Sequence, residues 1–135
     1  MRPQLIPVPG YRDLPKAIDF LVEAFGFERH AVYEDERGNL QHVELVLGGA
    51  MVMPAPVDGT EYGRLLRAVD DAGPTGGYYV VVDDVAAHEE RARSAGAQIV
   101  IPLREQEYGT DYTCRDLDGH LWTFGTYDPW ASTGE

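Results

Sequence analysis

The sequence predicts an α+β fold made of two consecutive βαβββ modules. Two amphipathic helix patterns occur, and each begins after an aspartate and ends at a glycine. Strand-like runs surround both helices in the same order, with one run before the helix and three after it. The two aspartates, Asp13 and Asp84, are 71 positions apart, which indicates that the chain repeats one supersecondary unit.

The first helix is expected to begin after Asp13 and to end at Gly26. Aspartate is a favoured N-cap, Pro15 is tolerated in the first turn, and glycine ends helices well. An apolar stripe at helical spacing marks the face that should be buried: Leu14, Ala17, Ile18, Leu21, Val22 and Phe25. The first module is expected over 5–56, with strands at 5–8, 29–33, 40–47 and 51–53.

The second helix is expected to begin after Asp84 and to end at Gly96. Its apolar face is smaller and consists of Val85, His88, Ala92 and Ala95. The second module is expected over 77–128, with strands at 78–82, 98–101, 111–115 and 121–126. The segment 57–76 between the modules is rich in glycine and proline and is predicted to be a linker with one short helix.

The composition indicates a globular protein with an acidic surface. The chain has 135 residues, of which 11 are basic and 23 acidic, and its net charge is −12. We expect a single domain over 1–135. Acidity argues against a nucleic-acid partner. The charge favours solubility, and it would also attract a cationic small molecule.

The sequence carries no signal that we would associate with a membrane or with export. No apolar run approaches the roughly 18 residues of a membrane span, and we expect neither a signal peptide nor a membrane partner. Cys114 is the only cysteine, so it has no disulfide partner within the chain. These features predict a cytoplasmic protein.

Three segments carry a resemblance to a known family: Asp13–Phe27, Val82–Val85 and, above all, Tyr108–Phe124 with its Asp118-Gly119 turn. In these segments the chain resembles the vicinal oxygen chelate superfamily, which includes glyoxalase I, extradiol dioxygenases, fosfomycin-modifying enzymes and bleomycin resistance proteins. The ending Trp122–Tyr127 is most similar to bleomycin-resistance-like and glyoxalase-like members. The resemblance implies curled mixed sheets that form a cleft, and a homodimer.

The resemblance also implies where a metal would be held. Metal-using members place one ligand on each of four strands, which here correspond to Ile6, Met53, Gly77 and Thr123. None of these four offers the imidazole, carboxylate or thiolate that a divalent cation prefers. We therefore expect no metal and no cofactor at the family's usual site. His42 and Glu44, two apart on one strand, leave a weaker metal signal elsewhere, with His30 and His120 as further donors.

The face that should line the cleft follows from the alternation of strand residues. The predicted ligand-binding residues are those that this alternation brings to one face: His42, Glu44, Met51, Met53, Tyr79, Tyr112, Cys114 and Thr123. The register of the strand 111–115 is left open, because Thr113 and Arg115 fit the same face equally well. Trp122 and Phe124 are expected beneath the helices.

Two functions of different classes fit these observations. The first is a metal-free small-molecule binding protein that sequesters an antibiotic, with a ligand that is cationic or aromatic. The second is an enzyme of the same superfamily, a lyase, isomerase or dioxygenase-like protein, in which His42 and Glu44 form an acid–base pair. A dimeric domain without a small-molecule role is a third reading. Cys114 lacks the evident base that a nucleophile needs.

Overall fold

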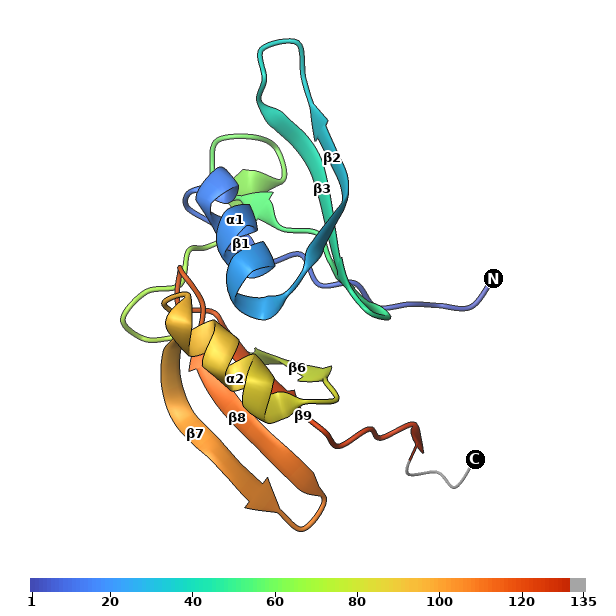
Figure 1. The fold of residues 1–135 in the computed structure, drawn as a ribbon. Helices are drawn as coiled ribbons and strands as arrows, with labels where there is room; N and C mark the ends of the chain where they lie inside the picture. Colours follow the sequence, from blue (N-terminus) through green and yellow to red (C-terminus); the bar gives the residue numbers. More distant parts are fainter. Residues whose placement is uncertain (132–135) are drawn as a thin grey trace. The chain divides into compact units, whose positions relative to one another are not determined.

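Figure 1 shows the chain in a computed structural model, which describes residues 1–131. The residues group into two compact units, and the boundary between Val69 and Asp70 falls inside the predicted linker. That linker contains one short 3-10 helix, η1 (Gly63–Leu65). No helix within residues 1–131 combines the length and the apolar character needed to cross a membrane.

Besides η1, the first unit contains one α-helix and five strands. Its elements are β1 (Gly10–Tyr11), α1 (Leu14–Phe25), β2 (Glu28–Glu34), β3 (Leu40–Leu47), β4 (Ala50–Val52) and β5 (Ala55–Pro56). β2, β3 and β4 form an antiparallel sheet, and β1 pairs in parallel with β5. The long hairpin of β2 and β3 is plain in Figure 1.

Helix α1 confirms the prediction made from its sequence. The carboxylate of Asp13 accepts a hydrogen bond of 3.1 Å from the backbone N–H of Lys16, as an N-cap should. Gly26 ends the helix in the left-handed conformation, with φ of 88°. The apolar stripe is buried apart from Val22, which is partly exposed.

The first strand lies later in the chain than predicted, and proline explains the difference. The carbonyls of Pro7 and Pro9 accept hydrogen bonds from the N–H groups of Met53 and Ala55, at 2.9 and 3.0 Å. A parallel ladder also needs donors on the first strand, and proline has none. Residues 7–9 therefore lie along the neighbouring chain without forming a regular strand, which begins only at Gly10.

The second unit carries α2 (Val85–Ser94) on a four-stranded sheet. Its strands are β6 (Gly77–Val81), β7 (Gln98–Gln106), β8 (Gly109–Arg115) and β9 (Leu121–Gly125), in the order β6-β9-β8-β7 with β6 parallel to β9. Asp84 caps α2 by accepting from the N–H of Ala87 at 3.1 Å, and Gly96 follows with φ of 102°. Trp122 and Phe124 are buried in this unit's core.

Both units thus have a βαβββ-like order, but none of the three sheets formed by residues 1–131 is curled. The first unit divides its strands between a three-stranded and a two-stranded sheet, and the second unit has an open four-stranded sheet. The repeat persists in the parallel pairing, where Gly10 opposite Ala55 corresponds to Val81 opposite Gly125. The cleft that the resemblance implied stays a prediction.

Candidate ligand-binding site

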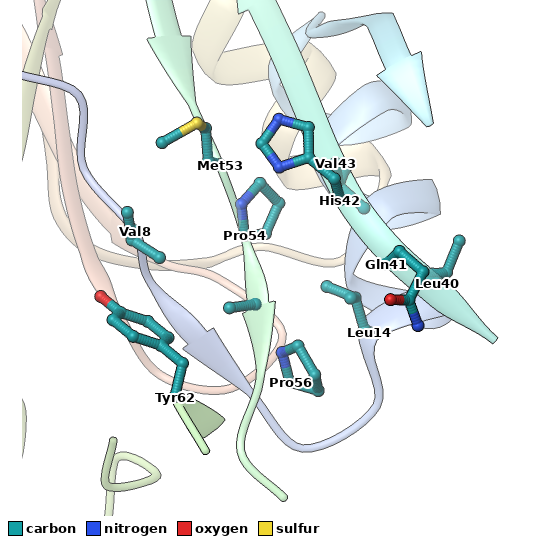
Figure 2. Close-up of a pocket in the computed structure, with 11 residues that line it drawn as sticks. Val8, Leu14, Leu40, Gln41, His42, Val43, Met53, Pro54, Pro56 and Tyr62 are labelled. Carbon is teal, nitrogen blue, oxygen red and sulfur yellow. The ribbon is translucent and has the colours of Figure 1, made fainter. Parts of the chain in front are cut away.

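A pocket of about 390 Å³ lies within the first unit (Figure 2). Its walls come from the start of β3, from the segment 53–56 and from single residues of other elements. The lining residues are Val8, Leu14, Leu40, Gln41, His42, Val43, Met53, Pro54, Ala55, Pro56 and Tyr62. Apolar walls with a few polar groups are typical of small-molecule sites.

The pocket opens where the pairing of β3 with the next strand stops. β3 and β4 are paired in antiparallel register as far as Leu45 and Val52. The next hydrogen-bonded pair of that ladder would join Val43 to Pro54. Proline has no N–H to donate to the carbonyl of Val43, so the ladder cannot continue.

The same donor is missing one step further along, at Pro56, which would face Gln41. The corresponding positions of the second unit are Phe124 and Thr126, and there the ladder is complete: β8 pairs with β9, and the N–H of Thr126 donates to the carbonyl of Thr110 at 3.0 Å. Two prolines spaced by two residues therefore explain why only the first unit has this gap between its strands.

The predicted pair of His42 and Glu44 forms a contact at the edge of the pocket. The imidazole Nε2 lies 2.7 Å from the Oε2 of Glu44, and only His42 of the two lines the pocket. The ring of Tyr33 stacks on that of His42 at 6.1 Å and 16°. His30 lies 3.8 Å from the other oxygen of Glu44. A carboxylate that accepts from Nε2–H leaves Nδ1 of neutral His42 with its lone pair.

Tyr62 belongs to a tight turn at the pocket. The carboxylate of Asp58 accepts from the N–H and the hydroxyl of Thr60, at 3.0 and 2.6 Å, and the Thr60 hydroxyl accepts from the N–H of Gly63 at 3.1 Å. A Cβ on Gly63 would meet the carbonyl oxygen of Pro56 at 2.7 Å. Glycine is therefore required for the turn that holds the exposed Tyr62.

The structure places the two methionines differently. Met53 lines the pocket, as Figure 2 shows, and its N–H is bonded to Pro7. Met51 pairs with Val46 and does not line the pocket. Both side chains are partly exposed. The prediction had grouped them as equivalent cleft residues.

The predicted residues of the second unit do not line this pocket. Tyr79 donates its hydroxyl to the carbonyl of Tyr127 at 2.7 Å. Thr123 lies opposite Thr113, with their hydroxyl oxygens 2.8 Å apart. Partners across a sheet share one face, so Tyr79, Thr113 and Thr123 lie together on the side away from Trp122.

Tyr112 and Cys114 lie on the other side of that sheet, which corrects their predicted place beside Thr123. Both are fully buried opposite Phe124 and Trp122 respectively. The Tyr112 hydroxyl is 2.6 Å from Nδ1 of His88 on α2. Burial, with the nearby charge of Asp116, raises the pKa of Cys114 to about 12, which makes it an inert thiol. The alternative register, with Thr113 and Arg115 on the face of Thr123, is the one observed.

The residues at the family's metal positions do not fit a divalent cation. Ile6 and Gly77 offer no side-chain donor, Met53 offers a thioether, and the Thr123 hydroxyl is already bonded to Thr113. Within residues 1–131 no three His, Cys, Asp or Glu side chains gather in a way that could hold a metal, and this includes His30, His42 and Glu44.

Sequence reasoning missed most of the pocket. It named His42 and Met53 but not Val8, Gln41 or Tyr62. The sequence signal for this pocket was the pair of prolines, Pro54 and Pro56, directly after a hairpin. Prolines at alternate positions prevent a strand from pairing on one side, which leaves a gap beside the neighbouring strand.

The chain is similar to proteins of one family over nearly its whole length. Residues 10–124 match the family model described as Glyoxalase/Bleomycin resistance protein/Dioxygenase superfamily. An uncharacterized protein of Mycobacterium bovis is 32% identical over 127 residues, which cover 93% of this chain and 84% of the relative.

Two solved structures share the fold. TioX from Micromonospora sp. ML1 is 32% identical, with a TM-score of 0.71 and coverage of 94% of this chain and all of the other. UcmS2 is 24% identical, with a TM-score of 0.74 and coverage of 93% and 99%.

Proposed function

The chain belongs to the Glyoxalase/Bleomycin resistance protein/Dioxygenase superfamily, and we propose that within it the chain is a metal-free small-molecule binding protein that sequesters an antibiotic-like ligand. The observation that carries the proposal is the pocket between β3 and β5, which two prolines hold open. The chemistry of the four metal positions supports it, because none supplies a strong metal ligand.

The pocket favours an aromatic or otherwise apolar ligand with few polar groups. Val8, Met53 and the prolines supply apolar contact, and methionine adapts to ligands of varied shape. Tyr62 adds an aromatic surface. The net charge of −12, with Glu44 near the pocket, favours a cationic ligand over an anionic one.

Thermal shift of the metal-stripped protein tests this proposal. A panel of aromatic, cationic and peptide antibiotics should contain compounds that raise the melting temperature, because a ligand at a hundred times its Kd stabilises the folded state by about 2.7 kcal/mol. Met53→Glu and Val8→Glu should abolish the shift, whereas Tyr79→Phe in the second unit should keep it. The proposal fails if no compound binds, or if binding requires stoichiometric zinc, nickel, iron or manganese.

The contact between His42 and Glu44 favours one second candidate, an enzyme that uses these residues as a proton-transfer pair. Nε2 lies 2.7 Å from Glu44, and in the tautomer whose Nε2–H donates to this carboxylate, Nδ1 would act as the base at the pocket. Under this alternative a bound panel compound should be converted, and His42→Gln should stop conversion while binding remains. Recovery of the unchanged compound after prolonged incubation would reject the enzyme.

A further inference from the structure

We infer that the pocket recognises its ligand through an amide group, which pairs with the main chain of β3 at Val43 and takes the place that Pro54 leaves vacant in the ladder. This inference rests on the proposed function and names the chemical class of ligand for the same site. It concerns main-chain atoms, which the pattern of side chains does not reveal.

The direction of the main-chain groups follows from the observed bonds. In the segment 53–56, the N–H groups of Met53 and Ala55 donate to the carbonyls of Pro7 and Pro9, away from β3. Since successive residues of a strand point their main-chain groups to opposite sides, residues 54 and 56 face β3. Both are proline, so this side of the segment has no donor.

The register set at Leu45 and Val52 turns the main-chain groups of Val43 toward this segment. Beyond Val43 the pairing of β3 with β2 shifts register at Gln41, so the regular alternation ends there. Among residues 1–131 no ladder joins β3 to β5. Val43 is buried, with 2% of its surface exposed, and a buried main-chain group without a partner is costly. A ligand that satisfies these groups gains more than the same contact would give at an open surface.

The main-chain groups of Val43 define the ligand. A strand residue offers one N–H and one C=O toward the same side of the strand. An acyl amide or a short peptide presents the complementary donor and acceptor, which is how extended peptides add to the edge of a sheet. Apolar substituents of the ligand would then contact Met53 and Tyr62.

The second unit shows what the amide replaces. At the corresponding positions its own chain closes the ladder through Phe124 and Thr126. Over residues 1–131, the pairing is thus present in one copy of the repeat and absent from the other. A ligand amide would complete in the first unit the bonding that the chain completes in the second.

The first arm of the test uses N-acetyl-L-tryptophan methylamide as the probe, with its analogue methylated on both amide nitrogens as the matched control. In a ¹⁵N-edited NMR titration, the amide signal of Val43 should shift with the probe, and the methylated analogue should bind at least tenfold more weakly. Equal affinity of the two compounds, an unmoved Val43 signal, or no binding up to the solubility limit would overturn the inference.

The second arm restores the missing donor. Pro54→Ala returns an N–H opposite Val43, and it should close the ladder, slow hydrogen exchange at residue 54 and weaken the probe at least tenfold. Pro74→Ala, in the linker, should leave binding unchanged. If Pro54→Ala binds the probe as the unaltered chain does, the inference is wrong.

The two arms separate this inference from the proposed function. Binding of panel antibiotics with no preference for amide N–H groups would retain the small-molecule function and reject the amide. Failure of every compound, probe included, would reject both.

Discussion

Among single side-chain substitutions in the turn before β9, removal of the Asp116 carboxylate is expected to lower the stability of the fold most. This carboxylate is buried, and one oxygen accepts from the N–H groups of Asp118, Gly119 and His120 at 3.0 to 3.1 Å. The other accepts from the indole Nε1–H of Trp122 at 2.9 Å. One side chain therefore fixes both the turn and the largest buried aromatic of the second unit.

The magnitude follows from the hydrogen bonds that the substitution removes. A hydrogen bond to a charged group contributes about 1.5 to 3 kcal/mol, and a buried donor left unpaired costs about 1 to 3 kcal/mol. The three turn N–H groups share one oxygen, so we count them as one strong interaction and the indole as a second. Asp116→Ala should then lower the free energy of unfolding by about 3 to 5 kcal/mol.

Urea denaturation followed by circular dichroism measures this loss, with Asp71→Ala as an exposed control that should cost less than about 0.5 kcal/mol. Asp116→Asn isolates the indole, because an amide that keeps its oxygen on the turn presents its NH₂ to Trp122. The double variant Asp116→Asn/Trp122→Phe should then lose less free energy of unfolding than the sum of the two single variants. The reasoning is refuted if Asp116→Ala falls within about 1 kcal/mol of the control, or if the double variant is additive.

Three further predictions concern the core, the pocket and the assembly. Burial raises the pKa of Cys114 from 9.0 to about 12, so the thiol ionises in the unfolded chain at a lower pH than in the folded protein. The contribution of the neutral Cys114 thiol to stability is therefore complete below pH 9 and should be lost as the pH rises toward 12. The folded protein should also not react with a thiol reagent at pH 8. A rapid reaction would contradict this. Gly63→Ala should displace Tyr62, because the new Cβ meets the Pro56 carbonyl. It should weaken ligand binding and lower the free energy of unfolding by about 1 to 3 kcal/mol. Gly59→Ala, with open space around it, should change neither ligand binding nor stability. Sedimentation should give a homodimer of the 15.0 kDa chain, and a monomer at micromolar concentration would reject the dimer.

The helices were predictable from the sequence because their signals are local. Asp13 and Asp84 act within three residues of themselves, and the apolar stripe of α1 needs only the helical period to be recognised. The repeat of 71 positions then predicted the same order of strands along the chain in both modules. None of these inferences required knowledge of which strands are neighbours.

The register of β8 could not be predicted because both of its faces are buried. Residues Asp111, Tyr112, Thr113 and Cys114 are all at most 8% exposed, so no alternation of polar and apolar residues distinguishes the faces. The pairing of Thr113 with Thr123 decides the question, and that pairing joins segments on two different strands. For this reason the sequence did not show that Tyr112 and Cys114 lie on the face opposite Thr123.

The sequence by itself determined the family, the repeated βαβββ order and the lack of strong metal ligands at the four family positions, because each depends on residue type and on spacing along the chain. Only the tertiary structure revealed the pocket at which we propose that a ligand binds. The pocket exists because Pro54 and Pro56 face β3 and not β1, and a strand's two sides become different only when its neighbours are in place. If the same two prolines stood one residue earlier or later in the segment, they would face β1 and leave the ladder to β3 intact.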